Sequence, residues 1–303
     1  MGSGRFDSDV HTKATYARRS AGKSDFEYSD TATKIHKNLD PQRIKDKPYP
    51  KLESRDSKEH PESNAVFVCF DVTGSNIQNA IVAQKKLPNL MALLEQYISD
   101  PQVLIAANDD IEAVGINSIQ ISEFESDNRI DEHIRNVWLT NDGGGNDGES
   151  YDLILFAASS MTEIDCLEKR GRKGYFFMYA DEPIRTHVQA LQVQRIFGVP
   201  CEGKLSVSEV IKKLKSKYHV FVIWPNGGYK HARVQYEHLF GKDSVVTLQH
   251  PNLICELIGS LVGMTEEKLT EPAHVVRDLV KVGMSSSEAK EVSQSLVPMF
   301  EAR

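Results

Sequence analysis

Short apolar segments recur along the middle of the chain, and their pattern predicts β-strands. Four are continuous apolar runs, which is typical of strands that are buried on both faces; they cover residues 65–70, 103–107, 175–180 and 219–224. Residues 117–124 alternate between apolar and polar side chains, as an edge strand does. Residues 245–248 supply a last, short strand.

Helical patterns separate these strands. They cover residues 77–98, 130–138, 151–167, 184–196, 207–214 and 253–262. Because strand and helix alternate, the sequence predicts an α/β fold with a doubly wound, mostly parallel, Rossmann-like sheet that carries helices on both faces. We place this domain at residues 63–264.

The segments on either side of this domain have a different character. Residues 1–62 contain few aliphatic side chains and cannot form a core of their own, so we expect an extended, polar arm held by the body or by neighbouring subunits. The charged run 53–61 within it is expected to be a solvated loop. Residues 265–303 predict a helical hairpin, with Gly283 ending one helix and 285–288 capping the next.

The charge is distributed unevenly along the 303 residues, whose formal net charge is −7. Residues 1–62 hold 13 Lys and Arg against 11 Asp and Glu, whereas the remainder holds 23 against 32. An acidic body lacks the basic patches that bind phosphate backbones, which argues against nucleic acid as a general partner.

The composition also bears on the compartment. No run approaches the roughly 18 apolar residues of a membrane span, and the first residues lack the apolar core of a signal peptide. The four cysteines lie far apart, without the paired spacing of a metal, redox or disulfide motif. We therefore expect a cytoplasmic protein without a membrane partner.

Candidate chemistry follows the buried runs, because ligands of open parallel sheets collect at the carboxyl ends of the strands. Asp71, Thr73 and Ser75 come directly after the first run, and Asp181 comes after the third. A glycine-rich loop at 140–150 lies between them. Carboxylate and hydroxyl oxygens are hard ligands that suit Mg²⁺ and also accept Mn²⁺ or Ca²⁺.

These segments resemble a known family. Residues 66–75 resemble the first strand and D-x-S-x-S motif of the von Willebrand factor A (vWA) domain, with its metal-ion-dependent adhesion site. Residues 143–150 resemble the G-G-G-D-x-P-E-S form of its second loop, and 179–183 are similar to its third loop, commonly T-D-x-P-P-H. The resemblance covers residues 64–262, keeps the family's motif order and suggests an intracellular member of bacterial or phage type.

The resemblance implies how a cation would be held. Thr73 and Ser75 would coordinate it directly through their hydroxyl groups, and Asp71 and Asp181 would act mainly through water. One position would stay open to an acidic group from a partner. Thr73 stands where the family has serine, which preserves the hydroxyl.

The second loop departs further from the family. Its ligand, usually threonine, falls near Asn146, so the resemblance leaves Asn146 or the neighbouring Asp147 to serve. Residues 143–148 also fit a G-x-G-x-x-G nucleotide motif by letter, but the acidic residues in and around the loop suit a cation better than a pyrophosphate. Asp71 and Thr73 could instead only cap the following helix, although a cap needs one oxygen and this turn offers three.

Three functions follow from these alternatives. The leading hypothesis is a non-enzymatic, divalent-cation-dependent protein-binding module. The second is a structural subunit of a homo- or hetero-oligomeric assembly that uses the arm and the hairpin for contacts between subunits. A metal-assisted hydrolase comes third, because no nucleophile or general base is evident. Arg185 and His187 either line the mouth of the site or have a surface role unrelated to binding.

Overall fold

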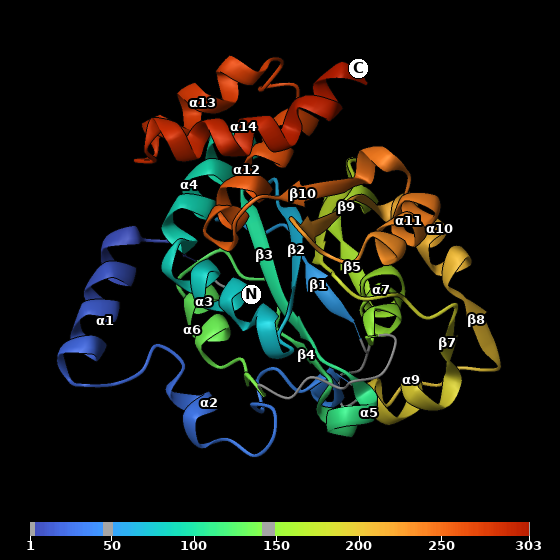
Figure 1. Cartoon of the computed structure of the whole chain (residues 1–303). Helices are drawn as coiled ribbons and strands as arrows, with labels where there is room; N and C mark the ends of the chain where they lie inside the picture. The colour runs from blue at the N-terminus through green and yellow to red at the C-terminus, as the bar shows by residue number, and fades with distance from the viewer. Residues whose placement is uncertain (1–3, 45–50, 141–148, 303) are drawn as a thin grey trace.

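A central, mostly parallel sheet organises the chain, whose computed structural model describes residues 4–44, 51–140 and 149–302 (Figure 1). The order across this six-stranded sheet is β10-β9-β6-β2-β3-β4, and every neighbouring pair is parallel except β3 with β4. The strands are β2 (Asn64–Asp71), β3 (Pro101–Asn108), β4 (Ile119–Ile121), β6 (Gly174–Tyr179), β9 (Tyr218–Pro225) and β10 (Val245–Leu248). The predicted α/β class with a mostly parallel sheet is confirmed.

Helices flank the sheet and bury its two faces in separate cores (Figure 1). One core involves α3 (Ile77–Lys85), α4 (Leu87–Tyr97), α6 (Arg129–Arg135) and α12 (Ile254–Thr265). The other involves α7 (Tyr151–Ser160), α9 (Ala190–Phe197), α10 (Val207–Lys217) and α11 (Lys230–Phe240). Successive side chains of a strand point to opposite faces: Val66 and Val68 enter the first core and Phe67 and Cys69 the second, which is why β2 is apolar throughout.

Smaller elements complete the described chain. Two short sheets pair β1 (Leu52–Ser54) with β5 (Thr162–Ile164) and β7 (His187–Gln189) with β8 (Lys204–Ser206). Further helices are α1 (Ser8–Ser20), α2 (Glu27–Thr31), α5 (Ile111–Val114), α8 (Asp165–Glu168), α13 (Pro272–Lys281) and α14 (Ser286–Glu301). The 3₁₀ turns are η1 (Pro41–Ile44), η2 (Gly74–Asn76), η3 (Gly115–Asn117), η4 (Lys242–Ser244) and η5 (Pro251–Leu253). None of the described helices combines the length and apolar character that a membrane span requires.

Some predicted helices have different bounds. The pattern at 77–98 is two helices that meet at Lys86, because Pro88 lacks an N–H and fits only the first turn of a new helix. The pattern at 151–167 is interrupted by β5, which pairs with β1, and the pattern at 184–196 becomes helical only at Ala190. In each case a tertiary contact or a local break ends or delays the helix that the spacing of apolar residues predicts.

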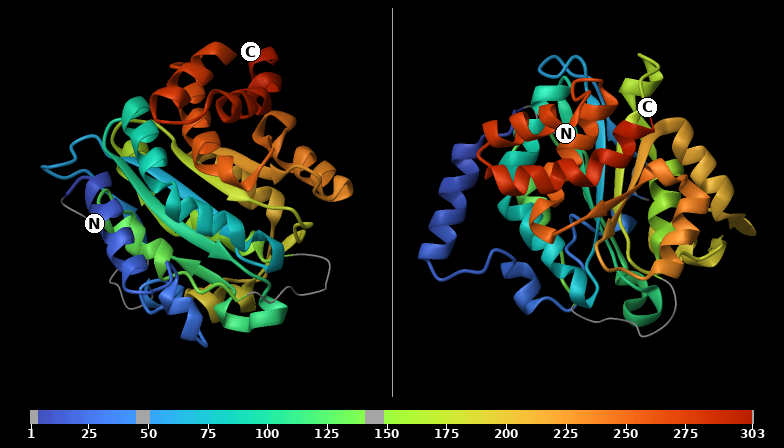
Figure 2. Two further views of the ribbon diagram at one scale, coloured as in Figure 1. Left: turned by 60° about the vertical axis from the view of Figure 1, so that its left-hand side comes forward. Right: turned by 45° about the horizontal axis from the view of Figure 1, so that its top comes forward.

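The N-terminal segment is not extended throughout, which corrects that expectation. Helix α1 occupies 8–20, and the Asp7 side chain caps it by accepting hydrogen bonds from the backbone N–H groups of Asp9 and Val10 at 2.8 and 3.0 Å. Further on, Leu39 is buried in the first core, and its carbonyl accepts the N–H of Ile121 at 2.8 Å. The segment therefore lies along the outside of its own body (Figures 1 and 2).

The charged run 53–61 is likewise not simply a solvated loop. Leu52–Ser54 forms β1, and the Arg55 guanidinium donates hydrogen bonds to the carboxylates of Glu53, Asp165 and Glu168 at 2.8 to 3.1 Å. The hydrogen bonds of Arg55 link the end of the N-terminal segment to α8, and the parallel pairing of β1 with β5 links it to β5.

The C-terminal hairpin agrees with its local signals. Gly283 follows α13 with a φ of 97°, a value that glycine adopts without strain. Ser285 and Glu288 then form a capping box at the start of α14. Buried side chains of both helices, Val275 and Leu296 among them, belong to the first core.

The packing of the N-terminal segment predicts that it stabilises the body. Leu39→Ala should lower the free energy of unfolding by about 2–5 kcal/mol, because it leaves a cavity in the first core. Lys37→Ala, at an exposed position nearby, should change it by less than about 0.5 kcal/mol. Urea unfolding of the two variants compares these values, and equal midpoints would show that the segment is not anchored to the core.

Candidate functional site

Asp71 ends the central strand β2 and is completely buried. Its Oδ1 accepts hydrogen bonds from the backbone N–H of Thr73 at 2.8 Å and from the Thr73 hydroxyl at 2.6 Å. The chain can turn sharply here because Gly74 has a positive φ of 24°. Thr73 therefore lies against Asp71 in the turn between β2 and α3, as the sequence predicts.

Tyr151, the first residue of α7, connects Asp71 to Asp181. Its buried hydroxyl donates a hydrogen bond to Asp71 Oδ2, lies 3.3 Å from Asp181 Oδ1 and accepts the backbone N–H of Asp181 at 3.4 Å. The Asn76 amide donates to Asp181 Oδ2 at 2.9 Å. The ends of β2 and β6 thus bring together two of the predicted carboxylates, as expected for neighbouring parallel strands.

Two further carboxylates follow β3, at the same edge of the sheet. Asp109 accepts a hydrogen bond from the Thr140 hydroxyl, and Asp110 Oδ1 accepts the N–H of Glu112 at 3.0 Å. Both are almost fully buried. Asp109 and Asp110 were not predicted from the sequence, although the strand-end rule that located Asp71 and Asp181 also applies to the apolar run at 103–107.

Arg185 connects three of the loops around this edge. Its guanidinium donates to Asp110 Oδ1 and to the Ser150 hydroxyl, both at 3.2 Å, and lies 3.9 Å from Asp152 Oδ1. Of the two positions left open by the sequence, Arg185 therefore lines the site. His187 lies in β7 with an exposed side chain.

The electrostatics of this edge are unfavourable for so many carboxylates. Burial, aided by the charge of Asp181, raises the pKa of Asp71 to about 7. Burial, together with the charges of Asp71, Asp110, Asp109 and Asp181, raises the pKa of Glu149 to about 9. Glu149 is buried, and its Oε2 has no hydrogen-bond partner among the described residues. The hydrogen bonds and the positive charge that the described residues supply therefore do not fully stabilise the ionised forms of Asp71 and Glu149.

The remaining predicted ligands are not placed. Ser75 lies in η2, but its side chain is outside the described part, as are Asn146 and Asp147. Within the described ranges, no group of three or more His, Cys, Asp or Glu side chains is arranged to hold a metal ion. A cation at this edge would therefore also need hydroxyl groups, water or the second loop.

Tyr151 and Asn76 are residues of the site that the sequence did not identify. Asn76 lies one position beyond the D-x-S-x-S pattern, and Tyr151 follows the G-G-G-D-x-P-E-S pattern directly. Both residues donate hydrogen bonds to carboxylates of another loop, so their roles become visible only when the loops are placed side by side.

Comparisons with known proteins give little further information. No model of a known protein family matches the chain, and no curated protein matches it. Similar solved structures include the open conformation of the pilus adhesin SpaC from Lactobacillus rhamnosus GG, with 10% identity, a TM-score of 0.44, and coverage of 71% of this chain and 31% of the adhesin. A second crystal form of SpaC gives 11% identity and a TM-score of 0.42, with the same coverage. The chain thus spans about a third of the adhesin's length, and a likeness of this size carries no inference about function.

The raised pKa values predict an unusual pH dependence of stability. The pKa of Glu149 is about 9 in the folded chain and ordinarily 4.5, so the folded state holds a proton that the unfolded state releases between these values. In chelator, the free energy of unfolding should therefore fall as pH rises from 6.5 to 8, by up to about 1.4 kcal/mol per pH unit for one proton. Urea unfolding at several pH values measures this slope.

Two variants isolate the cause of this slope. Glu149→Gln should reduce the slope without abolishing it, because Asp71 and Asp152, whose pKa values are raised to about 7, also release protons in this window. Glu202→Gln, at an exposed position, should leave the slope unchanged.

The pH range from 6.5 to 8 limits the contributions of two other groups. The pKa of His133 is lowered to about 4 and that of Lys217 to about 8, so both change the stability mainly outside this range. A stability that rises with pH throughout the window would contradict the prediction.

Proposed function

We propose that this chain is a non-enzymatic protein-binding module with a vWA-like, doubly wound fold. A divalent cation, Mg²⁺ or in its place Mn²⁺ or Ca²⁺, would be held at the edge formed by the ends of β2, β3 and β6. A carboxylate of a protein partner would complete its coordination shell. The observation that carries the proposal is the meeting of Asp71 and Asp181 around the Tyr151 hydroxyl.

The strand order supports this location. Strand β2 lies between β3 and β6, so the direction in which the chain adds strands reverses beside it. Ligands of doubly wound sheets bind at such a switch point, outside the carboxyl ends of the strands. Asp71 ends β2 and Asp181 follows β6 closely, so both belong to this switch point.

The available donors fit a hard cation. The Thr73 hydroxyl donates its proton to Asp71 at 2.6 Å, so a lone pair of this oxygen remains for a metal ion. Asp71 and Asp181 would then both act mainly through water, as the resemblance implies. Among the described residues the buried Glu149 Oε2 has no hydrogen-bond partner, and the pKa of Glu149 is raised to about 9, so a cation here would favour the charged form of this carboxyl group. The cation would supply the attraction for the partner's carboxylate.

The alternative of a structural subunit depends on segments that could reach a neighbour. The N-terminal segment is instead bound to its own body: Asn128 exchanges two hydrogen bonds with the backbone of Asp7, and Arg135 donates to Thr15. Intrachain packing accounts for how this segment is held, so the argument for neighbouring subunits loses its main support. We therefore favour the binding module.

Substitutions of Thr73 test the cation site directly. Thr73→Val keeps the shape of the side chain but removes its oxygen, whereas Thr73→Ser keeps the hydroxyl. We expect the wild type and Thr73→Ser to bind Mn²⁺ or Mg²⁺ in calorimetry and to gain about 2.7 kcal/mol of stability at 100 times Kd. Thr73→Val should lose both effects. Absence of cation binding by the folded wild type would overturn the proposed function.

The partner's role is tested separately. Once a partner is identified, Asp71→Ala or excess chelator should abolish its capture while circular dichroism shows that the fold is retained. Neutralising the partner's acidic residue should have the same effect, because its carboxylate completes the shell. Capture that continues unchanged in chelator would contradict a cation-dependent mechanism.

A further inference from the structure

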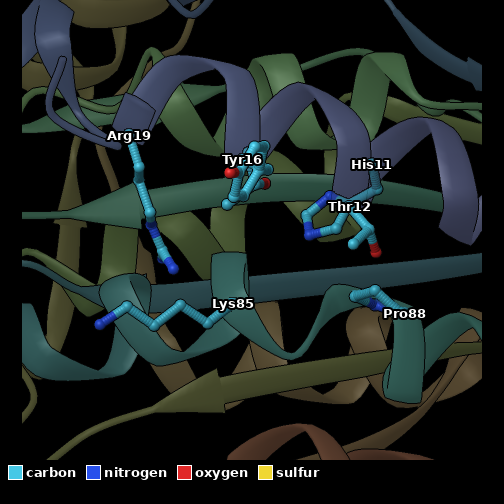
Figure 3. Close-up of a pocket in the computed structure, with 7 residues that line it drawn as sticks. His11, Thr12, Tyr16, Arg19, Lys85 and Pro88 are labelled. Carbon is cyan, nitrogen blue, oxygen red and sulfur yellow. The ribbon is translucent and has the colours of Figure 1, made fainter. Parts of the chain in front are cut away.

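A pocket of about 360 Å³ lies between α1 and the junction of α3 with α4 (Figure 3). Five residues of α1 line one wall and two residues of the body line the other: His11, Thr12, Thr15, Tyr16, Arg19, Lys85 and Pro88. The α1 residues share one face of the helix, since they are spaced by one, three or four positions. Only His11 is buried within α1, so this face borders a hollow and does not pack tightly against the body.

The charge of this pocket is opposite to that of the acidic edge. Arg19 and Lys85 approach it from opposite walls, and no Asp or Glu is among the described residues that line it (Figure 3). Arg19 uses one of its nitrogen atoms to bind Asp25 at 2.7 Å, which leaves its other donors available. Lys85 is exposed and has no ion pair within the described part of the chain. Asp25 offsets part of the charge of Arg19, and Asp131 Oδ1 lies 3.2 Å from His11 Nδ1. Neither carboxylate lines the pocket, so Lys85 and the remaining donors of Arg19 favour an anionic ligand.

Neutral donors complete the polar side of the pocket. The Thr15 hydroxyl accepts a hydrogen bond from Arg135 at 2.7 Å, so its own proton remains to be donated. Thr12, one helical turn earlier on the same wall, adds a second hydroxyl. Guanidinium, ammonium and hydroxyl donors together match the several acceptor oxygens of a phosphate group.

The pocket also has a flat, apolar side. The Tyr16 side chain is large and hydrophobic yet leaves 74% of its surface exposed, and Pro88 lies on the facing wall. An exposed aromatic ring beside a cavity can stack on a ligand ring at a low cost in conformational entropy. The ligand that fits both sides carries a dianionic group and an aromatic ring.

We propose that this pocket binds an aromatic phosphate monoester. The phosphate lies between Arg19 and Lys85, and the aromatic ring lies against Tyr16. The pocket is independent of the proposed cation site, because α1 lies on the flank of the molecule whereas the acidic residues follow the carboxyl ends of β2, β3 and β6 (Figure 1). Failure of either proposal therefore leaves the other intact.

Phenyl phosphate is the probe that tests this site, with the full chain kept in chelator and binding followed by calorimetry. We expect saturable binding that Lys85→Ala weakens roughly tenfold through loss of a charge-assisted hydrogen bond. Lys13→Ala is the matched control, because Lys13 is an exposed lysine of α1 that does not line the pocket. Tyr16→Ala should reduce the affinity for phenyl phosphate to that for inorganic phosphate.

The outcomes separate support from failure. No saturable binding by the folded wild type, or equal binding by Lys85→Ala and the wild type, would overturn the proposal. Equal affinities of the wild type for inorganic phosphate and phenyl phosphate would also overturn it, because the ring would then contribute nothing. A phosphotyrosine peptide in a parallel titration identifies the source: tighter binding than phenyl phosphate indicates a modified protein, and weaker binding indicates a free small molecule.

Discussion

The burial of several carboxyl groups at one edge of an otherwise apolar sheet is the constraint on which the candidate site depends. Strand β2 is buried over its whole length and ends at Asp71, so the chain places an acid where water cannot solvate its charge. The neighbours of β2 add Asp109, Asp110 and Asp181 at the same edge. Hydrogen bonds from Thr73, Tyr151, Asn76 and Arg185 offset part of this cost.

The hydrogen bonds also give the edge a defined geometry. Tyr151 connects the ends of β2 and β6, and Arg185 connects the loop after β3 to the start of α7. Tyr151 is fixed at the start of α7, and Arg185 is fixed by its ion pair with Asp110. The carboxylates that these two side chains contact therefore cannot simply move apart to relieve their repulsion. The repulsion and burial are therefore expressed in the raised pKa values of Asp71 and Glu149, which favour the protonated form of both carboxyl groups.

The sequence predicted those parts of the fold that depend on local pattern. Continuous apolar runs identified four strands of the central sheet, because strands buried on both faces must be continuously apolar. Alternation at 117–124 indicated β4, and the short segment at 245–248 indicated β10. The strand-end rule then located Asp71 and Asp181, and it would have located Asp109 and Asp110 had it been applied to every run. Tyr151 and Asn76 could not be assigned in this way, since their roles arise only from contacts between loops distant in sequence.

Tertiary contacts also explain the errors outside the site. Residues 162–164 continue a helical pattern, but they pair with β1 and become a strand, a change that no local period indicates. Residues 8–20 lack the aliphatic stripe of a core helix, yet the Asp7 cap starts a helix that buries only His11. A helix with so little apolar contact is held mainly by polar contacts at its ends and sides, and this arrangement leaves open the pocket beside Arg19 and Lys85. The lack of an aliphatic stripe, which made this helix difficult to predict, is thus also the reason why the proposed ligand pocket stays open beside it.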